Sequence, residues 1–545
     1  MQALIDSVGT LSSKERRALA ILLKEKGINL FGIAPICSRG ADEAPVLSYT
    51  QESQWFLWQL EPDSTAYHIT TALRLTGELD LDALRHAFDT LIARHETLRT
   101  TFSEDDGTAV QVVHPPAPLD IEVIELHAGG LSYEAQVHAL TDSKSQPPFD
   151  LRNGPLLRAK LLRVAADEHV LVLTQHHIVS DGWSMGVMVD ELIQLYAGYR
   201  QGRTVSLPEL PIQYADYANW QRQWMDAGER ERQLGYWLEQ LAGEQPLLML
   251  PLDHPRPAIQ SYRGALLDIP LPEELRLGLK QLAQREGATL FMLLLASFQV
   301  LLHRYSGQAD IRVGVPTANR NRVETERLIG FFVNTQVLKA EIDGQMSFSQ
   351  LLQQVRQTAL AAQAHQDLPF EQLVEALQPE RSLSHNPLFQ VMFNHQVEAV
   401  GAAGPLNLPG LSIEALDAQG QSAQFDLTLD TVETQGRIAA SLVYATDVFD
   451  AATIERLAAH WRQLLQGVAS QPQQRIGLLP LLGADEQAQI LDQWNRLQQA
   501  FPSRACVHQL IEAQAARAPQ AIALTFAGQS PVSYTHLTLP TKRIV

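Results

Sequence analysis

The run Val170–Leu173 is unbroken in apolar residues, which indicates a strand buried on both faces. Beyond it the apolar residues recur at helical spacing and stop near Gly202; they are Val189, Leu192, Ile193 and Tyr196. The segment between the two patterns, Gln175–Ser184, therefore joins a buried strand to a helix. Such a junction is held by both neighbours and stays open on one side, which suits side chains that carry out chemistry.

Strands and helices alternate along most of the chain. Ile69–Leu75 is typical of a strand, and Leu81–Arg94 places its apolar residues on one helical face. From about residue 228 to residue 470 the pattern predicts a buried helix at Thr289–His303 and a final helix from an Asp450 cap to Leu465. Between them it predicts three strands, at Ile311–Pro316, Phe425–Thr431 and Ile438–Tyr444. The pattern predicts an α/β fold with two halves.

The N-terminal residues predict a helix of their own. Ser12–Glu15 can form a capping box, the residues from Glu15 to Lys26 favour a helix, and Gly27 can end it. Two interpretations stay open: the helix packs on the next domain, or it docks on a protein that precedes this chain. We expect a linker at 34–45.

Composition narrows the class of protein. The 545 residues carry a formal net charge of −19, which argues against a nucleic-acid partner, because phosphate binding needs clustered Lys and Arg. The two cysteines, Cys37 and Cys506, suggest a reducing compartment. No apolar signal core begins the chain, and the apolar stretch Leu290–Leu302 is too short to span a bilayer. These features predict a soluble cytoplasmic protein without membrane contact.

The chemistry is concentrated in the stretch around His176 and His177. A histidine beside a core strand is most often a structural residue, and this interpretation stays open. A metal site is disfavoured, because neighbouring side chains on extended backbone point to opposite faces. The same alternation would place one imidazole toward a cleft and the other toward the core. An imidazole with an ordinary pKa near ~6.5 suits general-base catalysis.

Two further residues of the stretch complete the hypothesis. Asp181 would need a cationic partner if it were buried. Gly182 allows close approach of the backbone, and its N–H can donate to a developing oxyanion. No Ser or Cys nucleophile is implied, so direct transfer between two bound substrates is the simpler chemistry.

At this point the chain resembles the condensation domains of nonribosomal peptide synthetases, relatives of chloramphenicol acetyltransferase. The histidine stretch is similar to their HHxxxDG signature, the third of seven motifs. The other six resemblances follow in the family's order; they are Leu47–Leu57, Arg94–Phe102, Tyr214–Trp220, Ile329–Thr335, His365–Phe370 and His385–Gln390.

The resemblance implies a fold and a domain organisation. We expect two chloramphenicol acetyltransferase-like lobes in a V-shaped pseudo-dimer, with the active site in the cleft between them. The expected segments are a docking-type helical segment at 1–33, a linker at 34–45, an N-lobe at 46–227, a C-lobe at 228–470, a linker at 471–504, the opening of an adenylation domain at 505–537, and an atypical tail at 538–545.

The resemblance also implies a reaction, in which an amide bond forms between an upstream aminoacyl or peptidyl thioester and a downstream aminoacyl amine. Both substrates would be carried on 4'-phosphopantetheine arms of separate carrier domains, with no covalently bound cofactor and no metal. An adjoining adenylation domain is a further expected partner. The sequence around the first and third motifs resembles members that accept a donor ending in an L-residue.

The resemblance assigns roles by position. His177 and Gly182 are expected to be catalytic, and His176 is expected to be structural. An arginine should pair with Asp181; we favour Arg94 and keep Arg99 and Arg320 as alternatives. The candidates for substrate contact are Trp183, Ser184 and Asn334, although a capping role for Asn334 is equally open.

Other functions, both within this superfamily and outside it, are alternatives to peptide-bond formation. Epimerisation domains share the histidine stretch, but they do not normally continue into an adenylation opening, which residues 507–537 resemble. In that opening the resemblance implies a helix at His508–Glu512 and the first adenylation motif at Val532–Leu537. Cyclisation domains carry aspartates where this chain has His176 and His177. A stand-alone acyltransferase of the same superfamily and an inactive platform that recruits another enzyme are the remaining alternatives. Residues 538–545 depart from the family, and Pro540 would break the helix expected there.

Overall fold

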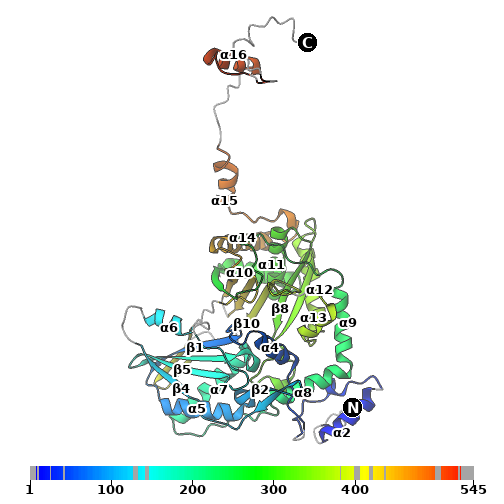
Figure 1. Cartoon of the computed structure of the whole chain (residues 1–545), viewed down its shortest axis with the longest axis vertical. Coiled ribbons are helices and arrows are strands. Elements are labelled where there is room, and N and C mark those ends of the chain that lie inside the picture. Colours follow the sequence, from blue (N-terminus) through cyan, green and yellow to red (C-terminus); the bar gives the residue numbers. More distant parts are fainter. Residues whose placement is uncertain are drawn as a thin grey trace. The chain divides into compact units, whose positions relative to one another are not determined.

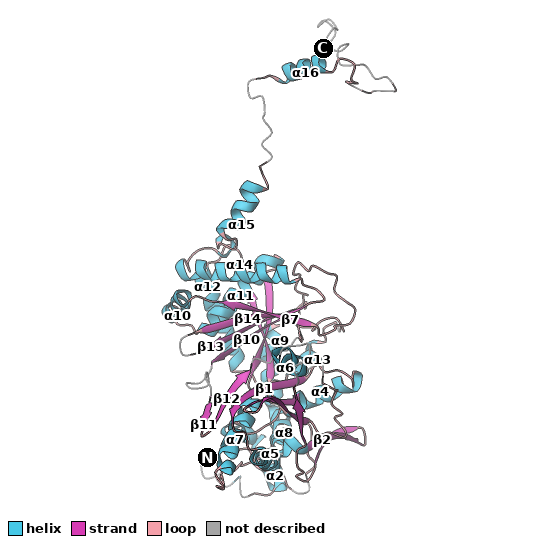
Figure 2. Cartoon of the chain, turned by 90° about the vertical axis from the view of Figure 1, so that its left-hand side faces the viewer, coloured by secondary structure: helices cyan, strands magenta, loops and turns pink. Residues whose placement is uncertain are grey.

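The computed structural model describes residues 8, 11–24, 26–40, 43–126, 133–141, 146–380, 382–397, 406–416, 422–434, 437–496, 505–523, 525 and 528. The chain divides into two compact units, Met1–Leu481 and Leu482–Val545. The first unit contains two six-stranded sheets, which are shown with their helices in Figures 1 and 2. This agrees with the expected two-lobed α/β architecture.

The first sheet is built around the predicted strand that leads to the histidines. Its order is β11 (Leu406–Leu408), β12 (Leu411–Leu416), β1 (His68–Gly77), β6 (Glu168–His176), β5 (Leu157–Ala165) and β4 (Ile121–Glu125). Only the β4–β5 pair is parallel, and β1 lies against β6 with His68 opposite His176. The helices α5 (Leu81–Arg94) and α7 (Gly182–Arg200) pack on its outer side (Figure 2).

The second sheet forms the larger core. Its order is β7 (Gly264–Pro270), β14 (Ile438–Ala445), β13 (Leu427–Glu433), β10 (Val391–Val397), β8 (Asp310–Thr317) and β9 (Asn334–Glu341). Its outer side is covered by α10 (Glu273–Arg285), α11 (Leu290–Ser306), α12 (Phe348–Gln363) and α14 (Ala451–Ser470) (Figure 2). Buried Trp461 ties α14 to α11, because its Nε1–H donates to the Ser297 hydroxyl at 3.0 Å.

The periodicity located these elements well. The predicted helix at Leu81–Arg94 is α5 with the same bounds, and the long buried helix is α11. Asp450 does stand at the N-cap of α14, but its side chain makes no capping hydrogen bond. It accepts instead from Nε2 of His254 at 2.9 Å, so the position was predicted correctly and the contact was not.

The predicted lobe boundary between residues 227 and 228 does not account for one segment of the second half that joins the sheet of the first lobe. The strands β11 and β12 come from the second half of the chain, yet β12 pairs with β1 from Ala72–Leu416 to Gly77–Leu411 and extends the first sheet. Strand pairing over more than 300 residues leaves no local signal, so the sequence assigned 406–416 to the wrong lobe.

The lobes are also joined by helices. The first motif forms α4 (Tyr49–Leu60), and α8 (Tyr214–Trp224) continues through a kinked turn at Met225–Glu229 into α9 (Arg230–Gln240), which runs along the side of both lobes in Figure 1. Besides the N-terminal helix α2 (Ser13–Lys24), the remaining described elements of this unit are α3 (Leu30–Ile33), η1 (Glu96–Arg99), β2 (Thr100–Asp105), β3 (Thr108–Val113), α6 (Tyr133–Thr141), η3 (His177–Val179), η5 (Val323–Thr325), α13 (Phe370–Leu377) and η6 (Ile476–Leu478).

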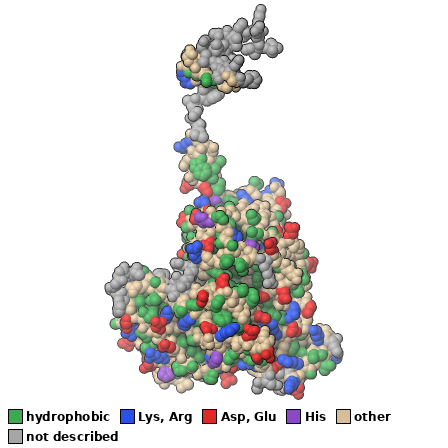
Figure 3. Space-filling view, viewed as in Figure 1, with side chains coloured by type: hydrophobic (Ala, Val, Ile, Leu, Met, Phe, Trp, Pro, Cys, Tyr) green, Lys and Arg blue, Asp and Glu red, His purple; other side chains and the backbone are tan. Residues whose placement is uncertain are grey.

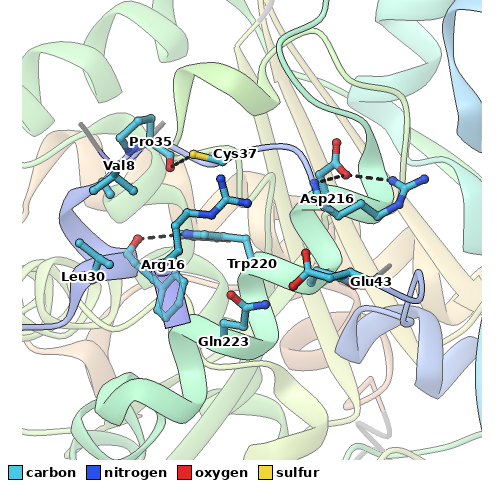
Figure 4. A pocket seen from close by; sticks show the side chains of 13 residues that line it. Val8, Arg16, Leu30, Pro35, Cys37, Glu43, Asp216, Trp220 and Gln223 are labelled. Carbon is cyan, nitrogen blue, oxygen red and sulfur yellow. Dashed lines mark hydrogen bonds and ion pairs between the residues drawn. The ribbon is translucent and has the colours of Figure 1, made fainter. Parts of the chain in front are cut away.

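The predicted N-terminal helix is α2 (Ser13–Lys24), and it packs on the domain that follows it. Ser12 and Glu15 form the expected capping contacts, and the Lys24 ammonium donates to the Asp226 carbonyl at 2.8 Å. Figure 4 shows the small pocket, of about 40 Å³, that remains between this segment and Trp220 of α8. The docking role of residues 1–33 stays a prediction.

The described residues of the predicted linker at 34–45, which are 34–40 and 43–45, also pack on this domain. Ile36 is buried, and Arg39 forms ion pairs with Asp216 at 2.9 Å and with Glu96 at 3.1 Å. Because this segment buries an aliphatic side chain and its arginine forms two ion pairs, it is part of the folded domain and not a linker. The polar, Gly- and Pro-containing composition of this segment therefore misled the sequence reasoning.

Residues 471–481 likewise belong to the second lobe, because Ile476 is buried there and Arg304 donates to its carbonyl at 2.9 Å. The second unit contains α15 (Ala484–Ala488), η7 (Gln489–Gln493) and α16 (Val507–Arg517), which matches the helix expected near residue 508. The motif expected at Val532–Leu537 and the tail at 538–545 lie outside the described residues.

Among the described residues, no single helix has the length and hydropathy needed to cross a membrane. The helices α10 and α11 pass such a test only together, and they are bent by 105°. Acidic and basic side chains are interspersed over the face shown in Figure 3.

We predict that Gly314→Ala destabilises the first unit by about 3 kcal/mol, because a Cβ on β8 would overlap the Phe389 ring in a closely packed layer. The matched control is Gly278→Ala on α10, where the new Cβ would meet Ala469 at 3.6 Å and stabilise the helix by up to ~1 kcal/mol. Urea unfolding midpoints compare the two variants. Equal midpoints would contradict the packing argument.

Candidate active site

The strand β6 ends at His176, and this residue holds the start of the following loop. Its Nδ1 accepts a hydrogen bond from the Ile178 N–H at 3.1 Å, and its ring lies edge-on to Phe149 with centroids 6.2 Å apart. Burial lowers the pKa of His176 to about 3, with further lowering from His68 and His177. The ring is therefore neutral near pH 7 and acts as an acceptor within the fold.

The neighbouring His177 starts the short 3-10 helix η3 and has a different surrounding. Its Nδ1 lies 2.8 Å from the Ser180 carbonyl oxygen. Because a carbonyl can only accept, this contact places the proton on Nδ1 and leaves the lone pair on Nε2. Burial lowers the pKa of His177, and Asp181 partly opposes this effect. A neutral imidazole with a free Nε2 is the form that can accept a proton.

A cavity of about 500 Å³ lies between the lobes, and His177 is part of its wall. The His177 ring packs against Phe331 of the second lobe, with centroids 4.5 Å apart. Both histidines contribute to the wall of this cavity, but their rings have different neighbours. The His176 ring packs on Phe149 and His68 of the first lobe, whereas the His177 ring packs on Phe331.

The cavity has an opening. A second hollow, of about 620 Å³, lies between the loops at 60–66 and 260–263. It shares five lining residues with the cavity that contains His177; they are Leu60, Glu61, Ser64, Gln260 and Tyr262. The two hollows therefore adjoin each other at these residues.

Asp181 is fully buried and is engaged on both oxygens. Oδ1 accepts from the Ser184 N–H at 2.7 Å, which caps α7, and Oδ2 accepts from the Phe332 N–H of the second lobe at 2.9 Å. Its ion-pair partner is Arg320, at 3.2 Å, whose side chain is 2% exposed. The guanidinium also stacks on Phe332, 4.0 Å from the ring centroid. A carboxylate with these partners positions the loop.

The favoured pairing of Arg94 with Asp181 was therefore wrong, and the alternative Arg320 is correct. Arg94 closes α5 and pairs with Glu191 of α7 at 3.0 Å. Arg99 donates to the backbone carbonyls of Ile92 and His114. Both of these arginines are engaged within the first lobe, whereas Arg320 reaches Asp181 from the loop after β8.

Trp183 and Ser184 contact the segment 326–330 of the second lobe. Ser184 is buried; its hydroxyl donates to the Gly330 carbonyl at 2.8 Å and accepts from Arg320 at 2.6 Å. Trp183 is half-exposed, and its Nε1–H donates to the Glu326 carbonyl at 2.9 Å. Neither side chain is among the described residues that line the cavity, so this geometry does not support substrate contact. Gly182 is also outside that lining, and its oxyanion role stays a prediction.

Asn334 does line the cavity, but its side chain is occupied. Its Nδ2 donates to the carbonyls of Gln366 and Leu368 at 2.8 and 2.7 Å, and its Oδ1 accepts from the Phe370 N–H at 3.1 Å. These contacts match the capping alternative, because they hold the segment that leads into α13.

The cavity also contains ionisable residues that the sequence reasoning did not place there, among them Glu61, His385 and Glu371. Glu371 lies in the first turn of α13, directly after the sixth motif, and lines the cavity together with His177. A glutamate on an amphipathic helix carries no local signal that it faces inward. In the described part of the chain, no three His, Cys, Asp or Glu residues come together as a metal-binding group.

Large peptide synthetases contain similar sequences. The chain is 46% identical over 506 residues to one of the linear gramicidin synthase proteins of Brevibacillus parabrevis, a match that covers 92% of this chain and 6% of that protein. It is 40% identical over 491 residues to phosphinothricin tripeptide synthetase PhsC of Streptomyces viridochromogenes, covering 89% of this chain and 45% of that protein. The chain thus spans less than half the length of either relative.

Solved structures show the same fold. The X-domain from teicoplanin biosynthesis superposes with a TM-score of 0.75 at 30% identity, over 82% of this chain and 100% of that one. A four-domain nonribosomal peptide synthetase bound to AMP and glycine superposes with a TM-score of 0.74 at 25% identity, over 90% of this chain and 37% of that one. The sequence also matches the family described as "Condensation domain" over residues 41–491. The chain therefore belongs to the condensation-domain family of nonribosomal peptide synthetases.

Proposed function

We propose that the chain forms an amide bond between a donor acyl thioester and an acceptor aminoacyl amine, each carried on the 4'-phosphopantetheine arm of a carrier domain. The observation that carries this proposal is the placement of His177, with its free Nε2, on the wall of an open cavity between two lobes. A cavity of about 500 Å³ has room for two acyl ends but not for the carriers, which would stay outside.

In the proposed reaction the acceptor nitrogen attacks the thioester carbonyl. A C–N bond forms, the C–S bond breaks, the proton of the attacking amine passes to Nε2 of His177, and that proton then goes to the leaving thiolate. Because a thioester is already reactive, positioning of the two arms also contributes to the rate. The effective molarity of two positioned reactants can by itself lower the activation free energy by ~7 kcal/mol or more. Asp181 takes no proton in this scheme; it holds the loop that carries His177.

The proposed partners follow from the reaction. Both carriers would be supplied by neighbouring domains, and the match to a four-domain synthetase supports such a setting. We propose that residues 505–537 open an adenylation domain. In support, the match to malpinin synthetase of Mortierella alpina extends over 98% of this chain, and α16 forms where the opening helix is expected. The preference for a donor that ends in an L-residue stays part of the proposal.

A second candidate function is a recruitment platform without catalysis. The observation in its favour is the similarity to the X-domain from teicoplanin biosynthesis, which has also been solved in a complex with OxyB. An assay with two loaded carriers separates the candidates, because a condensation enzyme yields a dipeptidyl thioester. Carrier binding without any product would favour the platform.

We predict that His177→Ala lowers the rate of dipeptidyl thioester formation by at least about 100-fold, since the proton acceptor at the reacting nitrogen is lost. The control is His254→Ala, a half-exposed histidine of the second lobe outside the cavity, which should leave the rate unchanged. Product is measured by mass spectrometry of the acceptor carrier. An unchanged rate in the His177 variant would remove this residue as an essential base.

We predict that Arg320→Met destabilises the first unit by about 3 kcal/mol, because it leaves the Asp181 carboxylate buried without its cation. The double variant D181N/R320M should recover part of this loss, since it removes both charges. Arg85→Met is the matched control; its pair with Asp82 is exposed, and surface pairs contribute about 1 kcal/mol or less. Urea midpoints test the series, and equal losses for both single variants would contradict the buried-pair argument.

A further inference from the structure

The cavity has an uneven set of charges. The described residues of its lining include two carboxylates, Glu61 and Glu371, and no Lys or Arg. Glu61 is exposed and lies at the opening, whereas Glu371 lies deeper, in the first turn of α13. Arg263 lines the outer hollow, but it is paired with Asp447. A cavity whose described lining has carboxylates and no Lys or Arg favours a cationic ligand over an anionic one.

Glu371 has one carboxyl oxygen without a partner within the fold. Its Oε2 atom is buried and has no hydrogen-bond partner among the described residues. Burial raises the pKa of Glu371 to about 7; hydrogen bonds from its own backbone N–H and from Ser53 oppose the rise, and Glu52 adds to it. A buried carboxyl without a cation is costly to the fold, so a partner brought in by a ligand would stabilise its ionised form.

The helix α4 lies between the Glu371 carboxyl and the contacts of His177. Thr50 and Ser53 stand one turn apart on its cavity face, about 5 Å along the helix. The Thr50 hydroxyl donates to the Phe331 carbonyl at 3.2 Å, and the Phe331 ring packs on His177. Ser53 lies beside the Glu371 carboxyl and lowers its pKa. Glu371 and His177 line the same cavity, on either side of this face of α4.

We propose that Glu371 is the binding residue for the α-ammonium group of the acceptor aminoacyl thioester. This inference rests on the proposed function and extends it to the acceptor. An α-amino group with a pKa near ~7.7–8.0 arrives mostly protonated at neutral pH and cannot attack in that form. The ammonium gives one proton to the Glu371 carboxylate, which leaves a neutral amine and a carboxylic acid. The amine then attacks as described above, and the acid returns its proton to solvent after product release.

The assignment also defines the class of acceptor. Substrates with a free ammonium at the reacting position are favoured, and acceptors with a carboxylate side chain directed into this part of the cavity are disfavoured, because no described lining residue offers a cation to them. The contacts of Asn334 with Leu368 and Phe370 hold the start of α13, where Glu371 lies.

The test measures binding without turnover. The probes are alanyl-aminopantetheine, an amide analogue with a free amine, and its N-acetyl derivative, which has no charge; calorimetry gives the affinity of the full chain for each at pH 7. We expect the chain to bind the free amine at least about 10-fold more tightly than the acetylated probe, as a charge-assisted contact in a buried site requires. Glu371→Gln should abolish this preference, and Glu371→Asp should keep part of it.

The matched control is Glu375→Gln, one turn further along α13 on an exposed position, which should keep the full preference. A Glu371→Gln variant that still prefers the free amine would overturn the assignment. So would equal affinities of the two probes for the unaltered chain, a comparison that depends on no variant. The loaded-carrier assay reports separately whether the chain forms the amide bond, so failure of the proposed function and failure of this inference are distinguishable.

Discussion

The buried pair of Asp181 and Arg320 is the contact on which the arrangement of the site depends. A carboxylate with no solvent access must be fully paired, and this one takes its partners from both lobes. The Ser184 N–H comes from its own helix, whereas Arg320 and the Phe332 N–H come from the second lobe. The same carboxylate that caps α7 therefore also sets the position of the second lobe beside the histidine loop.

The segment from Leu328 to Asn334 shows how this contact reaches the chemistry. The Phe332 N–H binds Asp181, and the preceding residue, Phe331, packs its ring on His177. Asn334 holds the turn from which Glu371 enters the cavity. One short stretch thus connects the anchored carboxylate, the free imidazole and the unpartnered carboxyl oxygen. A shift of the second lobe would change the surroundings of all three at once.

Two further ties restrict such shifts. The strands β11 and β12 leave the second half of the chain and complete the first sheet, and α8 and α9 run along both lobes (Figure 1). The N-terminal segment packs on α8, where the Trp220 indole donates to the Phe31 carbonyl at 3.0 Å. The cavity is therefore lined by elements that are held from several directions, which is what a site that positions two substrates requires.

The sequence by itself determined the local elements and the identity of the reactive stretch. Apolar periodicity placed α5 and α11 within a few residues, and the spacing of two histidines, an aspartate and a glycine located the candidate chemistry. Only the tertiary structure decided that Arg320 pairs with Asp181, that Ser184 is buried between lobes, that residues 406–416 cross to the first sheet, and that Glu371 faces the cavity. Each of these contacts joins residues more than a hundred positions apart, or depends on which helix face meets the other lobe. Apolar periodicity depends only on residues within a few turns of one another, so it contains no information about a contact with the other lobe.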